Sequence, residues 1–355
     1  MNNDRIQEIL DLMEEARLDY FLISDPQSIA YCTGYYNDPH ERMFVFMISK
    51  HGNHTLFMND LFYLDHDLDV NIVWHKDEQD AIQTIVDEMH FPGRIGIDKN
   101  WASHFLLDLM KKLPDAKYIN ASPCVDLVRM KKDLQEQVLM IESSKINDAV
   151  MEEIIPFIQE GVTEKQLAKK LDELFFNHHS TCYGAIVAFG KNAADPHHEN
   201  DDTLLRKGDC VLIDMGCVYK GYCSDMTRTF FYEGILEEEI KVYEIVKKAN
   251  EAAEAMIKPG VKLSDIDKCA RKVISDEGYG KYFTHRLGHF IGRDVHEYGD
   301  VSSVNEMEVE EGMIFSIEPG IYLEGNFGVR VEDLVMVTKD GCQVLNSFTK
   351  DIYII

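Results

Sequence analysis

The feature that most constrains this chain is a pair of aspartates, Asp214 and Asp225, that lie next to two short apolar segments. Residues 211–213 and 227–232 are rich in β-branched and aromatic side chains, which is typical of buried strands. Tyr219-Lys220-Gly221 between them predicts a tight turn and hence a β-hairpin. A turn centred on Tyr219 and Lys220 places Asp214 directly opposite Asp225, with Cβ atoms about 4.5–5.5 Å apart.

Two carboxylates that face each other in an apolar setting repel, because burial removes the water that would stabilise their charges. Either one carboxyl group takes a proton or the pair shares a cation. We favour the cation, because the later part of the chain offers further ligands of the same kind.

The C-terminal part of the chain repeats its own order of elements. Gly161-Val-Thr163 opens one predicted helix and Gly260-Val-Lys262 opens another, each after a longer helix. Lys207-Gly208 precedes Asp214-Met-Gly216 as Glu311-Gly312 precedes Glu318-Pro-Gly320. Each half is therefore predicted to be two helices followed by a hairpin, and the common order favours duplication over chance.

The second predicted hairpin carries two more acids. Its strands are residues 314–317 and 329–337, and its turn is Glu324-Gly325-Asn326. Folding about Gly325 places Glu332 opposite Glu318. If the two hairpins meet across a pseudo-two-fold axis, four carboxylates converge, and two divalent cations would balance their charge.

A histidine usually completes such a ligand set, and His289 is the candidate. It follows Gly288, whose missing side chain allows a close approach of the backbone. Oxygen and nitrogen ligands without a thiolate favour manganese, cobalt, iron or zinc. The donor set by itself does not choose among these metals; of them we expect manganese, with cobalt or zinc as alternatives.

Length and composition bound the remaining possibilities. A chain of 355 residues favours two domains. Strands and helices alternate over about the first 120 residues, which indicates a small α/β domain. The turn-rich segment Asn120-Ala-Ser-Pro-Cys124 marks the expected boundary, giving domains 1–121 and 122–355 and an α/β (α+β) fold overall.

The charge balance argues against some partners. The net charge of −27 argues against nucleic acid and anionic membrane surfaces. The sequence contains no run of eighteen apolar residues, so it predicts no membrane span. Its eight cysteines form no Cys-x-x-Cys pair. The N-terminus opens an acidic amphipathic helix rather than a signal peptide, so we expect a cytoplasmic protein.

The five ligand candidates and their flanking residues resemble the metal-binding pattern of the pita-bread metallopeptidases. That family includes methionine aminopeptidases, aminopeptidases P and Xaa-Pro dipeptidases (prolidases). The resemblance extends from about residue 125 to the C-terminus, and the N-terminal domain is similar to the one that precedes it in prolidases and creatinases. It implies a pita-bread catalytic domain with an internal pseudo-two-fold repeat.

The resemblance also implies a role for each ligand. Asp214 would bind one metal ion, Asp225 and Glu332 would bridge two, and His289 with Glu318 would hold the other. A bridging hydroxide would attack the scissile carbonyl, and Glu318 would carry the proton to the leaving nitrogen.

Three further residues match family positions that assist the chemistry. His197 would contact the substrate or leaving group, and His296 would stabilise the tetrahedral intermediate. Arg330 would orient the carboxylates, although an ordinary pairing with a surface acid is the alternative. We expect His66, His178, His179 and His198 to be solvated, and His285 is as consistent with packing as with function.

Within the family, the chain length and the segment Asn37-Asp-Pro-His-Glu-Arg42 resemble compact bacterial Xaa-Pro dipeptidases, so a proline-containing dipeptide is the expected substrate and a homodimer the expected assembly. In those enzymes a loop corresponding to residues 37–42 reaches the partner's active site. Asp38, His40 and Arg42 would then limit substrate length, unless the loop is only a solvated turn. Arg293 is a candidate charge partner for Asp38 or for a substrate carboxylate.

Three alternatives stay open. One is an aminopeptidase P-type enzyme that removes the first residue from longer Xaa-Pro-peptides, and another is a non-catalytic peptide-binding protein on the same fold. The third is a metal-free creatinase-type hydrolase. The chain also departs from the family pattern: Phe290 stands where glycine is common, and Tyr298-Gly299 stands where proline often occurs. Phe290 is expected to narrow the substrate pocket.

Overall fold

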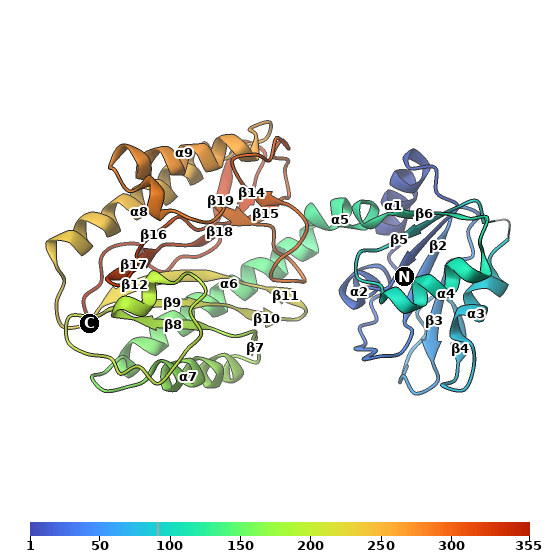
Figure 1. The fold of residues 1–355 in the computed structure, drawn as a ribbon, viewed down its shortest axis with the longest axis horizontal. Helices are drawn as coiled ribbons and strands as arrows, with labels where there is room; N and C mark the ends of the chain where they lie inside the picture. The colour runs from blue at the N-terminus through green and yellow to red at the C-terminus, as the bar shows by residue number, and fades with distance from the viewer. Residues whose placement is uncertain (91) are drawn as a thin grey trace. The chain divides into compact units, whose positions relative to one another are not determined.

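The computed structural model describes residues 1–90 and 92–355, which divide into two compact units, Met1–Arg129 and Met130–Ile355 (Figure 1). Helix α5 (Ser122–Met130) begins directly after the boundary expected at residue 121. Cys124, Val125 and Val128 of this helix are buried in the hydrophobic core of the first unit. In the described ranges, no helix is long and apolar enough to cross a membrane.

The first unit is built on one six-stranded sheet with the order β4-β3-β2-β1-β5-β6. Strands β1 and β2 and strands β2 and β3 pair antiparallel, whereas the other neighbours are parallel. The strands are β1 (Tyr20–Ile23), β2 (Val45–Ser49), β3 (Thr55–Asn59), β4 (Asn71–His75), β5 (Arg94–Ile97) and β6 (Lys117–Asn120). The other helices are α1 (Asn3–Glu15), α2 (Pro26–Thr33), α3 (Ala81–Glu88) and α4 (Ser103–Lys112). The α/β prediction for this part is confirmed.

Helix α2 has a clear local cause in the sequence. Asp25 caps it by accepting a 2.8 Å hydrogen bond from the backbone N–H of Ser28. Pro26 takes the first helical position, where its fixed φ fits and its missing N–H costs nothing. Gly34 ends the helix in a left-handed conformation.

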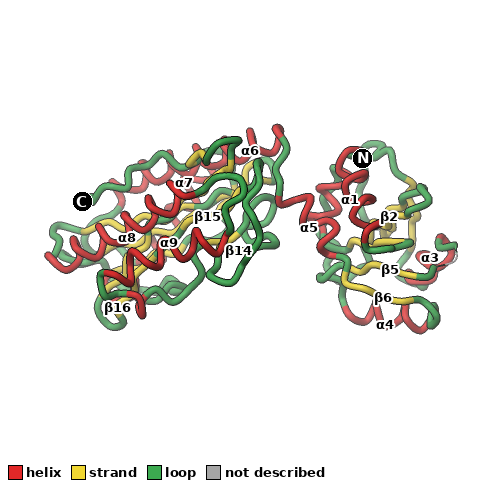
Figure 2. The backbone as a smooth tube through the Cα atoms, turned by 90° about the horizontal axis from the view of Figure 1, so that it is seen from above, coloured by secondary structure: helices red, strands yellow, loops and turns green. Residues whose placement is uncertain are grey.

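The second unit contains four long helices and two groups of strands. The helices are α6 (Leu134–Ile154), α7 (Glu164–Asn177), α8 (Glu237–Met256) and α9 (Leu263–Asp276). In Figure 1, α7 lies on one side of the strands and α8 and α9 lie on the other, whereas α6 runs obliquely across the strands; Figure 2 shows the same helices from above. Each half thus contributes a helix pair and a hairpin. The pita-bread prediction is confirmed.

The strands of the first half form two small sheets, with the orders β12-β9-β8 and β11-β10-β7. They are β7 (Thr181–Cys182), β8 (Ile186–Phe189), β9 (Cys210–Met215), β10 (Cys217–Tyr219), β11 (Tyr222–Cys223) and β12 (Met226–Phe231). The strands of the second half are β13 (Gly288–His289), β14 (Asp300–Val301), β15 (Ile314–Ile317), β16 (Gly320–Leu323), β17 (Phe327–Arg330), β18 (Asp333–Val337) and β19 (Cys342–Val344).

The register of the first hairpin differs from the prediction. Tyr219 pairs with Tyr222, and Asp214 pairs with Thr227 rather than with Asp225. Lys220 and Gly221 have φ values of 48° and 82°, so they are the two central turn residues. A two-residue turn with both φ values positive matches the twist of a hairpin, and glycine adopts that conformation without strain. The turn therefore lies one residue later than predicted.

Asp225 still points to the same face of the hairpin as Asp214. It lies two residues before Thr227, so it is a diagonal neighbour of Asp214, and side chains two residues apart in a strand share a face. The second hairpin has the predicted register, since Ile317 pairs with Asp333 and Gly320 with Arg330. Glu318 and Glu332 therefore occupy facing positions.

Candidate metal centre and active site

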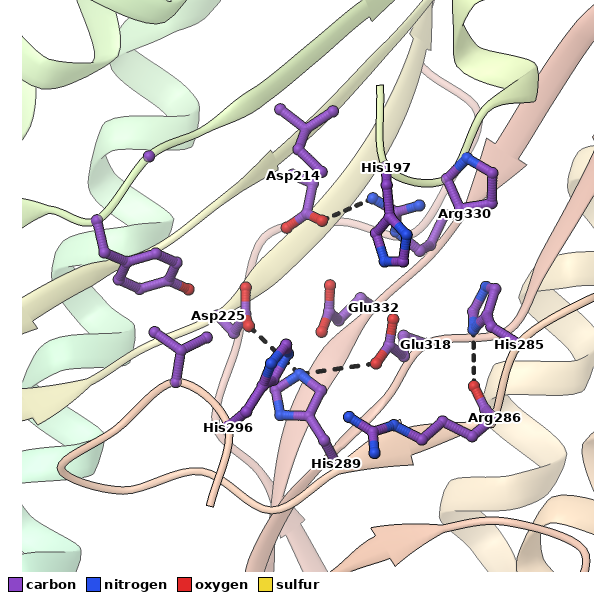
Figure 3. Close-up of a pocket in the computed structure, with 15 residues that line it drawn as sticks. His197, Asp214, Asp225, His285, Arg286, His289, His296, Glu318, Arg330 and Glu332 are labelled. Atoms are coloured by element: carbon purple, nitrogen blue, oxygen red, sulfur yellow. Dashed lines mark hydrogen bonds and ion pairs between the residues drawn. The ribbon is translucent and has the colours of Figure 1, made fainter. Parts of the chain in front are cut away.

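A cavity of about 430 Å³ opens in the second unit between the two hairpins. The residues predicted as ligands or catalytic groups all line it: His197, Asp214, Asp225, His289, His296, Glu318, Arg330 and Glu332. Figure 3 shows the four carboxylates and His289 directed toward one another. Three of these side chains, Asp225, His289 and Glu332, offer ligand atoms within 4.8 Å of one another.

Each ligand candidate sits at a strand or directly beside one. Asp214 lies in β9, and His289 lies in β13. Asp225 directly precedes β12, Glu318 directly follows β15, and Glu332 directly precedes β18. Acidic side chains can occupy such positions because the neighbouring apolar residues of each strand hold the backbone in place.

His289 is oriented as a metal ligand would be. Its Nδ1 lies 3.2 Å from the carbonyl oxygen of Phe290, which can only accept a hydrogen bond, so Nδ1 carries the proton. Burial, and secondly the neighbouring His296, lowers the pKa of His289 to about 3, so its other nitrogen is unprotonated. That nitrogen, Nε2, lies 3.6 Å from Asp225 and 3.7 Å from Glu318. The lone pair of Nε2 therefore faces the carboxylates of Asp225 and Glu318.

The carboxylates are unfavourable neighbours unless a cation joins them. Burial, and then repulsion from other acids, raises the pKa of Asp225 and of Glu332 well above the usual range. Burial also raises the pKa of Glu318 to about 7. Negative charges and a nitrogen lone pair that converge on one point repel, whereas a divalent cation would attract all of them. The residues present therefore fit a metal ion.

Arg330 holds the carboxylate of Asp214 in position through a hydrogen bond. Its Nη2 donates a 2.6 Å hydrogen bond to Asp214, and its Nη1 donates a 3.0 Å bond to the Tyr322 hydroxyl. Its Nε donates to the hydroxyl of Thr227, which in turn donates a 2.6 Å bond to Glu332. Arg330 is thus paired with a residue of the site rather than with a surface acid.

The sequence did not reveal Thr227 or Tyr322, which complete this network. Tyr322 lies 2.8 Å from Nε2 of His285, whose Nδ1 lies 2.7 Å from the Arg286 carbonyl. Since that Nδ1 must donate, Nε2 accepts from Tyr322. His285 therefore aligns Tyr322, which aligns Arg330. The signals for them along the chain were weak, since Thr227 lies two residues after Asp225 and Tyr322 is the one polar side chain of the strand Gly320–Leu323.

Gly288 is required by the close approach of two strands. A Cβ atom at this position would lie 1.9 Å from the carbonyl oxygen of Ser316, so no other residue fits without a backbone shift. The hydroxyl of Ser316 accepts a 2.9 Å hydrogen bond from the backbone of His289 and lies 3.2 Å from Glu318. Ser316 therefore links two of the ligand candidates.

His197 reaches the cavity from the loop after β8, and a buried carboxylate holds this loop. Glu164 accepts hydrogen bonds from the backbone N–H groups of Phe189 and Asp201. Its Oε2 also lies 2.6 Å from Nε2 of His198, which is only partly exposed. The expectation of a solvated His198 was wrong, because Glu164 on α7 is fully buried and requires partners.

His296 lies against His289, with ring centroids 4.2 Å apart in an edge-to-face arrangement. Burial, and secondly the charge of Arg286, lowers the pKa of His296. The side chain of the next residue, Glu297, is buried and lies 3.0 Å from the ammonium group of Lys132, which is also buried. This ion pair fixes the segment that carries His296.

Phe290 does not narrow the cavity. Its ring is fully buried and packs against Phe315, with centroids 5.3 Å apart. A Cβ atom on Gly299 would lie 2.7 Å from this ring. The two departures from the family pattern therefore compensate each other, because the large ring occupies the space that Gly299 leaves.

The predicted substrate-binding loop lies in the first unit. Asp38 and His40 are exposed, and the backbone N–H of His40 donates to the Asp38 carboxylate. Arg42 makes two hydrogen bonds with Asp77, of 2.9 and 3.0 Å. Arg293 lies over the Tyr222 ring, beside the Lys220-Gly221 turn, and the arginines that line the cavity are Arg286 and Arg330.

A buried cluster of acids around a neutral histidine, in a cavity of this fold, defines a metallohydrolase site. Residues 138–339 match metallopeptidase family M24, and residues 5–131 match the creatinase/prolidase N-terminal domain. The chain therefore belongs to metallopeptidase family M24 and is a metallopeptidase.

Known proteins similar to this chain agree with that placement. An uncharacterized peptidase of Staphylococcus aureus is 34% identical over 355 residues, covering 98% of this chain and 99% of its own. A dipeptidase of Pyrococcus horikoshii has a TM-score of 0.92 at 34% identity, covering 99% of this chain and 100% of its own. A prolidase of Thermococcus sibiricus has a TM-score of 0.93 at 31% identity, covering 100% of this chain and 99% of its own.

Proposed function

We propose that this metallopeptidase is an Xaa-Pro dipeptidase that uses two divalent metal ions. The observation that carries the proposal is the buried convergence of Asp225, Glu332 and the unprotonated Nε2 of His289. The similar solved structures named as a dipeptidase and a prolidase support the substrate class. A cavity of about 430 Å³ is near the lower end of the range for ligand pockets, which suits a substrate as small as a dipeptide.

Asp214 would hold one ion, His289 and Glu318 the other, and Asp225 and Glu332 would bridge both. We expect manganese, with cobalt or zinc as alternatives, because the donors are oxygen and nitrogen without sulfur. When bound, such ions make a coordinated water acidic and polarise a substrate carbonyl.

The side chains around the ions would then move protons and hold the substrate. Glu318 would accept a proton from the nucleophilic water and return it to the proline nitrogen, since it lines the cavity and Ser316 lies 3.2 Å from its carboxylate. His296 would donate to the oxygen that becomes negative in the tetrahedral intermediate. His197, on the opposite wall, would contact the substrate, and Arg330 would keep Asp214 oriented.

The remaining parts of the proposal concern the assembly. We propose a homodimer in which Asp38, His40 and Arg42 of one subunit limit substrate length at the partner's site, with Arg293 as a charge partner. Size-exclusion chromatography with light scattering tests the dimer. Activity of an Asp38→Ala variant on dipeptide and tripeptide tests the loop.

One assay separates the proposed activity from its alternatives. The protein, loaded with Mn²⁺, is given Met-Pro and Met-Pro-Ala in parallel. Cleavage of the dipeptide alone is the expected result. Cleavage of the tripeptide alone would instead support an aminopeptidase P activity. The chain is also similar to an X-Pro aminopeptidase structure of Thermotoga maritima, at 28% identity and a TM-score of 0.85. Binding without cleavage of either peptide would support a peptide-binding protein.

A further inference from the structure

The C-terminal segment of the chain lies directly behind the proposed metal centre. Arg228 follows Thr227 in β12, and its side chain is only 1% exposed. Consecutive residues of a strand point to opposite faces, so Thr227 faces Glu332 from the cavity side while Arg228 extends away from the cavity. There Arg228 contacts Phe348 and Thr349, which follow β19 in the chain.

Arg228 uses all its donor groups on three segments of the chain. Nη1 donates to the carbonyl oxygens of Thr227 at 2.9 Å and of Glu332 at 2.7 Å. Nη2 donates to Asp333 and to the carbonyl of Phe348, both at 2.8 Å, and Nε donates to the carbonyl of Thr349 at 3.0 Å. One guanidinium therefore binds both the backbone of a proposed metal ligand and the C-terminal segment.

Lys350 completes the connection from the other end. Its Nζ lies 2.8 Å from Asp333, the neighbour of Glu332, and 2.7 Å from both carboxylate oxygens of Glu254. It also donates to the side-chain oxygen of Asn250. The Asn250 amide in turn donates a 2.9 Å bond to the carbonyl of Ile317, the residue directly before Glu318. The ammonium group thus supports the backbone beside two ligand candidates.

The charges of this network balance. Arg228 and Lys350 face Asp333 and Glu254, so two cations meet two carboxylates in a largely buried space. Loss of one cation leaves a buried carboxylate without its counter-charge, and such a group will move toward water or toward another partner. Movement of Asp333 would shift Glu332, because the two residues are adjacent.

We propose that residues 348–350 are a positioning element of the metal centre, which through Arg228 and Lys350 fixes Glu332, so that docking of this segment and metal binding strengthen each other. The inference rests on the metal centre proposed above. Coupling of this kind is reciprocal, because each event must stabilise the other by the same free energy.

The first test uses the wild-type protein. Hydrogen–deuterium exchange is followed in peptides from residues 345–355, where the N–H of Phe348 donates to Asp148 and that of Ile355 donates to Phe231. Addition of saturating Mn²⁺ is expected to slow exchange in these peptides. Unchanged exchange, with Mn²⁺ binding demonstrated by calorimetry, would overturn the inference while leaving the metal centre intact. No binding of Mn²⁺ by the wild type would instead refute the proposed function.

The second test uses Lys350→Met and a matched control, Lys247→Met. Lys247 pairs with Asp351 in the same C-terminal segment, but its ion pair is with an exposed aspartate that has no part in the Asp333 network. Lys350→Met is expected to raise the Kd for Mn²⁺ about tenfold, as loss of groups that orient ligands commonly does. Lys350→Arg should restore most of the affinity, and Lys247→Met should leave it unchanged.

The two variants also separate positioning from simple stabilisation. Thermal unfolding of the metal-free variants measures the general contribution of each lysine. A Lys350→Met protein that is less stable yet binds Mn²⁺ with the wild-type Kd would show that the segment only stabilises the fold. If Lys350→Met does not fold, the comparison of Lys350→Arg and Lys350→Gln, together with the exchange experiment, decides the question.

Discussion

Thr227 donates a 2.6 Å hydrogen bond to Glu332, a residue 105 positions further along the chain. The same hydroxyl accepts a 3.0 Å bond from Nε of Arg330, whose Nη2 binds Asp214. A single side-chain oxygen therefore orients one proposed metal ligand directly and another through the guanidinium. It also joins the two related hairpins at the point where their acids meet.

Thr227→Val should weaken metal binding, because valine keeps the shape of threonine but lacks the hydroxyl. We expect the Kd for Mn²⁺ to rise about tenfold and the free energy of unfolding to fall by about 1–3 kcal/mol. Calorimetric titration and chemical denaturation measure the two effects. Thr229→Val is the control, since the Thr229 hydroxyl bonds only backbone groups of Arg330. Equal weakening in both variants would contradict a specific role for Thr227.

Asp225→Asn should remove bound metal and peptidase activity together. An amide lacks the negative charge needed to bridge two cations, and its N–H₂ group would face the Nε2 side of His289. Metal content after dialysis, measured by mass spectrometry, is expected to fall well below that of the wild type. Asp172→Asn, on the exposed face of α7, is the control and should keep full metal content. An active Asp225→Asn protein with full metal content would refute the proposed site.

The metal-free protein should become less stable as the pH rises from 6.5 to 8.5. Burial raises the pKa of Glu318 to about 7 from 4.5, so the folded state keeps a proton that the unfolded state has already lost. Stability from such a group is lost as the pH rises through the folded pKa. His289 and His285, whose pKa values burial lowers to about 3 and about 4, act in the opposite direction only below about pH 6.5.

Thermal unfolding at the two pH values measures this effect. A loss of about 1 kcal/mol corresponds to a fall of roughly 2–4 °C in a domain of this size. Metal-loaded protein is the reference, because a bound cation replaces the protons and should remove most of the pH dependence. A metal-free Tm that rises toward pH 8.5 would contradict the predicted protonation of the buried acids.

His198→Asn should reduce catalysis without loss of metal. The change removes the 2.6 Å contact with Glu164 and loosens the loop that presents His197 to the cavity. We expect kcat/KM for an Xaa-Pro dipeptide to fall about tenfold. His178→Asn is a matched control, since His178 makes a comparable 3.0 Å contact with Glu153 on the surface. The same loss of activity in both variants would argue against positioning of His197.

Much of the fold was predictable because its signals are local. Thr163 caps α7 by accepting a hydrogen bond from the backbone of Gln166, as the Thr-x-x-Gln pattern indicates. The three-residue turn of the second hairpin contains a glycine with φ of 75°, and its register followed from that position. The first hairpin was misplaced by one residue because Tyr219, Lys220 and Gly221 allowed two turns, and only the left-handed pair Lys220-Gly221 suits the strand twist.

The amino-acid sequence by itself determined which residues can act as ligands, since their chemical types, order and glycine neighbours are written along the chain. It also determined the helices, the hairpins and the likeness to a metallopeptidase family. Only the tertiary structure decided how those ligands are held. Thr227, Tyr322 and Arg228 act on partners that are distant in sequence, and His198 is held by Glu164 on a helix that lies earlier in the chain. Such contacts have no local pattern, because they arise only when separate elements pack and each buried polar group must find a partner.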